Sequence, residues 1–85
     1  MRFEWDGRKN AANRRKHGLD FADAWEIFEG PLLTAIDNRA DYGGDRWIGI
    51  GLLQSRVVVI VYTEHGDDTI RIISLRKPYT HERIR

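Results

Sequence analysis

The run from Arg56 to Glu64 limits what this chain can fold into more than any other segment. Its central residues, Val57 to Tyr62, are all apolar, so both faces of an extended strand formed here would be hydrophobic. Such a strand is stable where both of its faces are covered, which is the situation in the middle of a sheet. The run therefore predicts a central strand, and the remaining segments must supply its neighbours.

Segments on both sides of this run alternate between polar and apolar residues. They predict a short N-terminal edge strand and three further strands, at residues 2–5, 32–36, 46–53 and 69–77. The connections carry turn residues: Gly43-Gly44 in a polar loop over 37–45, Gln54-Ser55, and His65 to Asp68. Turns this short join antiparallel neighbours. Gly49 and Gly51 would share one strand face and leave room there for a close neighbour.

Two helices are predicted before the first of these hairpins. Asp6 is the expected N-cap of a helix over residues 7–17, which Gly18 ends. This helix has few apolar residues beyond Ala11 and Ala12, so its buried stripe should be thin.

The second helix has stronger signals, since Asp20 can cap it and Gly30-Pro31 stops it. Its apolar residues at helical spacing are Phe21, Ala24, Trp25 and Phe28. These side chains predict a buried stripe that packs on a sheet. The pattern favours a structural helix over a cofactor site.

A chain of 85 residues builds one domain, here taken as 1–85. The expected class is α+β: two N-terminal helices on an antiparallel sheet of about four strands, with the short edge strand and a C-terminal helical turn or tail from Tyr79. The absence of cysteine excludes disulfides and cysteine nucleophiles and fits a reducing compartment. No apolar run is long enough for a membrane span, so we expect a cytoplasmic protein.

Charge is distributed unevenly although the formal net charge is only +1. Residues 1–17 hold six basic and two acidic side chains, and residues 71–85 hold five basic and one acidic, so each end carries +4. The stretch 18–70 therefore carries −7. If folding brings the two ends together, they form a basic surface suited to a phosphate backbone.

Several of these residues also form a pattern known from one protein family. The N-terminal part of the pattern is Phe3-Glu4-Trp5-Asp6, Lys9, Asn13, Lys16-His17-Gly18 and Phe21. The later part is Arg46-Trp47, Tyr62-Thr63-Glu64, Arg71-Ile72-Ile73-Ser74, Arg76-Lys77 and Glu82-Arg83. In this order and spacing the chain resembles the BrnT family of bacterial ribonuclease toxins along nearly its whole length.

The resemblance implies a RelE-like fold and the toxin role in a type II toxin–antitoxin pair. It implies cleavage of RNA, neutralisation by a BrnA-type ribbon-helix-helix antitoxin in a complex with two copies of each chain, and contact with operator DNA only through that antitoxin. Relatives commonly continue into a longer C-terminal helix, whereas this sequence ends at Arg85. That difference motivates an alternative, a non-catalytic toxin-like module that acts as a corepressor through its antitoxin.

Metal-free RNA cleavage requires a base for the ribose 2′-hydroxyl and cations for the scissile phosphate. The candidate catalytic residues are Arg71, Arg76, Lys77, Glu64 and His17. The candidate RNA-binding residues are Lys9, Lys16, Arg46 and Tyr62. Arginine and lysine suit phosphate oxygens, and histidine is the candidate whose ordinary pKa lies near neutrality.

Four of these candidates also have a structural interpretation. His17 and Lys16 can compensate the dipole at a helix C-terminus, and Glu64 can pair with Arg71 or Arg46 across the sheet. Tyr62 would be half-buried with its hydroxyl reaching water.

Strand alternation puts Arg71 and Lys77 on one face and Arg76 on the other. The three can act at one spot only if the strand ends or bulges near Leu75. His65 and His81 are isolated in the sequence, and no histidine or carboxylate pair has metal-ligand spacing, so neither metal nor cofactor is expected.

Overall fold

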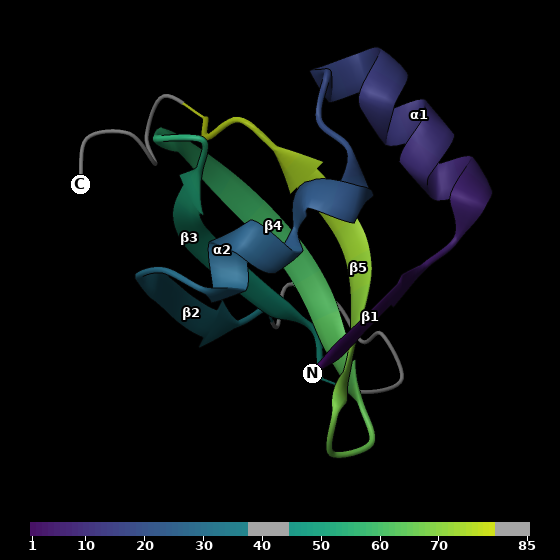
Figure 1. Ribbon diagram of the computed structural model, residues 1–85, viewed down its shortest axis with the longest axis vertical. Helices are drawn as coiled ribbons and strands as arrows, with labels where there is room; N and C mark the ends of the chain where they lie inside the picture. The colour runs from purple at the N-terminus through teal and green to yellow at the C-terminus, as the bar shows by residue number, and fades with distance from the viewer. Residues whose placement is uncertain (38–44, 80–85) are drawn as a thin grey trace.

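The structure is a computed structural model that describes residues 1–37 and 45–79. The helical elements are α1 (Gly7–His17), the 3₁₀ helix η1 (Phe21–Asp23) and α2 (Trp25–Phe28). The strands are β1 (Arg2–Trp5), β2 (Leu32–Ile36), β3 (Trp47–Leu53), β4 (Arg56–His65) and β5 (Thr69–Arg76). Together they form one sheet with helices on one face and at one edge (Figure 1). The α+β class predicted from the sequence is confirmed.

The sheet has five strands in the order β1-β5-β4-β3-β2. Strand β4 lies in the middle, as the apolar run predicts: Val58 and Ile60 are buried on the helix side, and Val59 and Val61 on the opposite side. The four strands from β2 to β5 are antiparallel, whereas β1 pairs with β5 in parallel. The sheet is therefore mixed. Its one parallel pair joins β1, the first strand of the chain, to β5, the last described strand.

The segment after Asp20 differs from the predicted single helix. It starts as the short 3₁₀ turn η1 and continues into the four-residue α2, and its fully buried residues are Phe21, Ala24 and Ile27. A 3₁₀ turn has three residues per turn, which places every third residue on the same side. The expectation that Trp25 is buried is therefore wrong, since its side chain is 50% exposed.

The glycines of β3 determine how closely α2 packs. A Cβ atom added at Gly51 would lie 2.7 Å from Cγ2 of Ile27, and one at Gly49 would lie 3.0 Å from Cδ1 of Leu32. Contacts this short are not tolerated without movement of the neighbour. The close approach predicted from the two glycines is confirmed, and its occupants are α2 and the start of β2.

Helix α1 has the predicted ends: Asp6 accepts from the backbone N–H groups of Arg8 and Lys9, and Gly18 adopts φ 71°. Its buried residue is Asn13, whereas Ala11 and Ala12 are exposed, which corrects the predicted stripe. The helix stands beside β5 at the edge of the sheet instead of lying with α2 over its face (Figure 1).

The side chain of Asn13 explains this position of α1. Its Nδ2 donates to the carbonyl oxygens of Leu75 and Leu19, and its Oδ1 accepts from the backbone N–H of Leu75. Strand β1 pairs with β5 only from Thr69 to Ile72, so Leu75 lies beyond its reach. The amide of Asn13 continues the hydrogen bonding along the edge of β5 where β1 has ended.

The predicted turn at Gly43-Gly44 and the C-terminal helical turn lie outside the described residues, except that Tyr79 follows β5 without helical structure. Among the described helices, none has the length and apolar composition required to cross a membrane.

Candidate functional site

A bulge in β5 decides how the C-terminal cations are arranged. Val61 of β4 pairs with Ser74, but its neighbour Tyr62 pairs with Ile72, so Ile73 is an extra residue in β5. Arg71 and Arg76 pair with Thr63 and Val59, which have the same parity on β4. Both arginines therefore lie on the sheet face opposite α2. Simple alternation along β5 would have separated them.

The two arginines are nevertheless well apart along this face. Their partners on β4 are four residues apart, which at about 3.3 Å per residue corresponds to roughly 13 Å. In this structure each arginine belongs to its own cluster of side chains: Arg71 contacts Glu4, and Arg76 contacts Tyr79.

The first cluster joins Arg71 to the edge of the sheet. Oε2 of Glu4 accepts from Nη1 of Arg71 at 3.0 Å and lies 3.0 Å from Nδ1 of His65. The hydrogen bond with His65, followed by that with Arg71, lowers the pKa of the Glu4 carboxyl below its ordinary value of 4.5. Arg71 thus pairs with Glu4, and the predicted pairing of Glu64 with Arg71 is wrong.

This contact gives a prediction for acid pH. A carboxyl with a lowered pKa in the folded state stabilises the fold fully above its unfolded pKa, and that stabilisation is lost as the pH falls through the lower folded pKa. We expect the carboxyl resonance of Glu4, followed by NMR, to titrate below 4.5. It should titrate closer to 4.5 in His65→Ala and in Arg71→Ala, with the larger change in His65→Ala.

The exposed Asp68, changed to Asn, is the control and should leave the Glu4 titration where it was. If the pKa of Glu4 is the same in all four proteins, the two contacts of its carboxylate do not form in solution.

The second cluster surrounds Arg76 at the end of β5. Its guanidinium carbon lies 3.9 Å from the centre of the Tyr79 ring, its Nη1 donates to the carbonyl oxygen of Lys77, and the residue is 7% exposed. Burial lowers the pKa of His17 below its ordinary 6.5, and the charges of Lys16 and Arg76 lower it further. A lowered pKa keeps His17 neutral near pH 7, which suits a proton acceptor better than a charged C-terminal cap.

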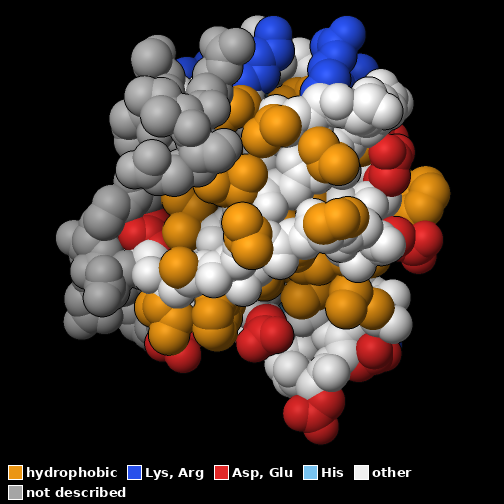
Figure 2. All heavy atoms as spheres, turned by 90° about the vertical axis from the view of Figure 1, so that its left-hand side faces the viewer, with side chains coloured by type: hydrophobic (Ala, Val, Ile, Leu, Met, Phe, Trp, Pro, Cys, Tyr) orange, Lys and Arg blue, Asp and Glu red, His pale blue; other side chains and the backbone are white. Residues whose placement is uncertain are grey.

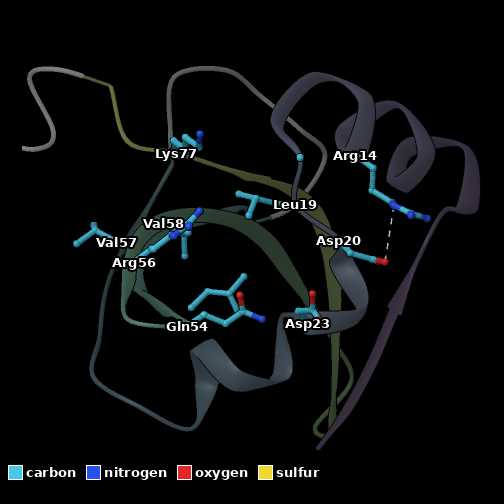
Figure 3. Close-up of a pocket in the computed structure, with 11 residues that line it drawn as sticks. Arg14, Leu19, Asp20, Asp23, Gln54, Arg56, Val57, Val58 and Lys77 are labelled. Carbon is cyan, nitrogen blue, oxygen red and sulfur yellow. Dashed lines mark ion pairs between the residues drawn. The ribbon is translucent and has the colours of Figure 1, made fainter.

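The remaining predicted site residues are dispersed. Lys77 follows the strand and lies on the α2 side, where it lines a cavity together with Arg14 and Arg56 (Figure 3). Glu64 is exposed near the end of β4, opposite Ile70. Lys9 and Lys16 are exposed on α1, and Arg46, just before β3, is half-buried.

Tyr62 is more buried than predicted, with 6% of its surface exposed. Its ring packs edge-on against Phe28 at 5.1 Å between centroids. Burial, with a smaller effect from the charge of Glu64, raises the pKa of its hydroxyl, while a hydrogen bond with Thr34 opposes that rise. The predicted half-buried position is therefore wrong, and Tyr62 is part of the core.

Three residues near these clusters were not identified as site residues from the sequence: Glu4, His65 and Asn13. Glu4 and His65 are 61 residues apart, and only the pairing of β1 and β4 with β5 brings them together. The signal available for Asn13 was a polar residue in the middle of a helix, where asparagine is not favoured. Within residues 1–37 and 45–79, no three His, Asp or Glu side chains gather in a way that could hold a metal ion.

Two comparisons relate this fold and its basic clusters to known proteins. A sequence model described as the ribonuclease toxin BrnT of type II toxin–antitoxin systems matches residues 5–82. The fold resembles the 1.1 Å crystal structure of the ribonuclease toxin BrnT from Brucella abortus, with a TM-score of 0.73 and 28% sequence identity. The resemblance covers 94% of this chain and 99% of the Brucella chain. A search of curated protein sequences finds no significant match.

A small α+β domain with this match over most of its length is a toxin of a type II toxin–antitoxin system. Its partner is by definition an antitoxin. The chain belongs to the BrnT family of ribonuclease toxins.

Proposed function

We propose that this toxin is an endoribonuclease that cleaves RNA without a metal ion and is neutralised by a BrnA-type antitoxin. The bulge at Ile73 is the observation that carries the proposal, because it turns Arg76 to the same face as Arg71. One face of the sheet then presents a guanidinium near each end of β5. RNA lying along β5 would meet both arginines, at phosphates of different nucleotides.

In this mechanism the cluster at Arg76 is the reaction centre. His17 is neutral near pH 7 and takes the proton of the ribose 2′-hydroxyl, whose oxygen then attacks the adjacent phosphate. The bond between phosphorus and the 5′-oxygen of the next nucleotide breaks, a 2′,3′-cyclic phosphate forms, and the leaving oxygen takes a proton from water. Arg76 stabilises the additional negative charge on the phosphate, and Lys16 adds a positive charge at the same end of α1. Because Tyr79 and Lys77 hold the guanidinium of Arg76, that group is ordered before substrate arrives.

The cluster at Arg71 has a binding role in this proposal. Glu4 fixes the Arg71 side chain and leaves its other nitrogens for a second phosphate. Glu64, the other candidate base, lies on the Tyr62 side of β4 and not on the face of the arginines. We therefore assign the base to His17.

A second candidate function is the non-catalytic module that represses its operon through the antitoxin. This non-catalytic function is favoured by the fact that both arginines already have partners or are buried within the protein. Arg71 is paired with Glu4, and Arg76 is 7% exposed. Side chains held in this way are also typical of a purely structural role.

The change Arg76→Ala separates the two functions. We expect RNA cleavage by the purified toxin to fall about 100-fold, as for the loss of one group that stabilises charge in the transition state, while antitoxin binding is retained. The rate of cleavage by the unchanged protein should also decrease at acid pH, with an apparent pKa below 6.5. This acid-side decrease should be absent from the pH–rate profile of His17→Ala.

Arg15→Ala, an exposed change on α1, is the control and should cleave RNA normally. Full cleavage by both Arg76→Ala and the double variant with Arg71→Ala would rule out this site. An unchanged toxin that leaves RNA intact and is harmless in cells without antitoxin would favour the corepressor.

The finer features of the biological setting are part of the same proposal. They are the RelE-like grouping of the fold, a ribbon-helix-helix antitoxin, a complex with two copies of each chain, operator contact only through the antitoxin, and action in the cytoplasm. The family match supports them by implying an antitoxin partner.

A further inference from the structure

A cavity of about 270 Å³ lies on the α2 side of the sheet, at the end of the molecule where β5 finishes. Its walls come from the end of α1, the N-cap residue Asp20 and last residue Asp23 of η1, the turn between β3 and β4, and Lys77 after β5 (Figure 3). Figure 2 shows Lys and Arg side chains gathered at this upper end, while Asp and Glu side chains lie further down. The cavity therefore opens at the basic end of the molecule.

Three cations line this cavity, and they differ in how far they are already engaged. Nε of Arg14 lies 3.8 Å from Asp20, whose carboxylate also accepts from Asn10 and Ala22. Arg56 and Lys77 form no ion pair within the part of the chain that the structure describes. Figure 3 shows these two on the side of the cavity away from Arg14 and Asp20. Two positive charges are thus available for an anion.

The floor of the cavity is apolar. Leu53 and Val58 are buried members of the core, and Leu19 packs against them from the loop after α1. Val57, at the rim, is 48% exposed. An apolar surface beside unpaired cations suits a ligand with a flat apolar part and a negative charge.

The turn that carries Arg56 is strained. Gln54 and Ser55 both have positive φ, 52° and 66°, although neither is glycine. This conformation is favourable for a two-residue hairpin turn but costs energy for residues with a side chain. Oε2 of Glu26 accepts from the backbone N–H of Gln54 at 2.8 Å and so holds the turn against α2. The turn held in this way sets the position from which the Arg56 side chain extends into the cavity.

We propose that this cavity is a subsite for one nucleotide of single-stranded RNA, with its phosphate between Arg56 and Lys77 and its base over Leu53 and Val58. The volume is close to the lower limit of small-molecule pockets, about 300 Å³, which fits a single nucleotide. Lys77 follows Arg76 directly but lies on the other side of the sheet. The RNA backbone therefore passes around the end of β5, from the Arg76 cluster into the cavity.

This subsite rests on the proposed ribonuclease function, but its test does not require cleavage. Uridine and adenosine 5′-monophosphates are titrated into the full chain and followed by amide NMR, with inorganic phosphate as a second probe. We expect the nucleotides to shift the amides of Leu19, Leu53 and Val58, and to bind more tightly than phosphate. Arg56→Ala and Lys77→Ala should each weaken nucleotide binding about tenfold.

Arg15→Ala has the same charge change on the exposed face of α1 and should bind nucleotide as the unchanged protein does. Absence of nucleotide binding, or equal binding by all variants, overturns the subsite. Equal affinity for phosphate and nucleotide overturns the role of the apolar floor. Loss of antitoxin binding in Arg56→Ala and Lys77→Ala, with nucleotide binding unchanged, assigns the cavity to the antitoxin and overturns the proposal.

Failure of the proposed function gives a different result from failure of the subsite. If the unchanged toxin binds nucleotide as expected but cleaves no RNA, the subsite stands and the catalytic assignment fails. If Arg76→Ala abolishes cleavage while Arg56→Ala and Lys77→Ala change neither cleavage nor nucleotide binding, the catalytic assignment stands and the subsite fails.

Discussion

Replacing Phe21 with alanine is expected to lower the free energy of unfolding by about 4 kcal/mol, whereas replacing Trp25 is expected to lower it by less than about 1 kcal/mol. Phe21, the first residue of η1, is fully buried in the core, so its removal leaves a cavity there. Trp25 is four residues further along the same segment but half-exposed. Urea denaturation followed by circular dichroism measures both variants without relying on tryptophan fluorescence.

The contrast between these two aromatic residues tests the 3₁₀ turn directly. In a continuous α-helix, Phe21 and Trp25 would lie on the same face, and both changes would be costly. Similar losses of stability in the two variants would therefore contradict the arrangement of η1 and α2. The magnitude for Phe21 is large for a domain of this size, whose total stability is about 5–15 kcal/mol.

Replacing Asn13 with alanine is expected to cost about 3 kcal/mol of unfolding free energy. The change leaves the N–H and the carbonyl oxygen of Leu75 without their partner, at a residue that is completely buried. Alanine is the better helix former, which offsets about 0.5 kcal/mol of this loss. The measurement is again urea denaturation, with Arg15→Ala as the exposed control on the same helix.

Hydrogen exchange gives a residue-specific measurement for the same variant. The amide of Leu75 should exchange much faster in Asn13→Ala, while the amide of Ile60 in the central strand should lose protection only in proportion to the global stability. If Leu75 stays as protected as Ile60, the side chain of Asn13 is not what secures this end of β5.

The features that could be predicted from the sequence are those set by neighbouring residues. The cap at Asp6 and the left-handed Gly18 depend on one turn of helix, and both are present. The central position of β4 follows from its apolar run, since a strand hydrophobic on both faces has no other stable place. The family resemblance followed from motifs in the chain itself, and the match over residues 5–82 confirms it.

The predictions that failed concern contacts between distant segments. The partner of β1 was not predicted from the sequence, because that partner and its parallel direction depend on where the whole sheet is assembled. The choice of a 3₁₀ turn at Phe21 depends on how η1 fits beside β5 and α2 beside β3, where Gly51 admits Ile27. Tyr62 is buried because Phe28, from a distant segment of the chain, packs on it.

For the site, the sequence alone determined which chemistry is present: arginines and lysines concentrated at the two ends, one histidine at a helix terminus, and no cysteine. Only the tertiary structure decided how these groups are combined. One extra residue at Ile73 brings Arg71 and Arg76 to the same face, and Lys77 is left on the other side with Arg56. The physical reason is that side-chain direction in a strand alternates strictly, so a single bulge reverses every residue beyond it.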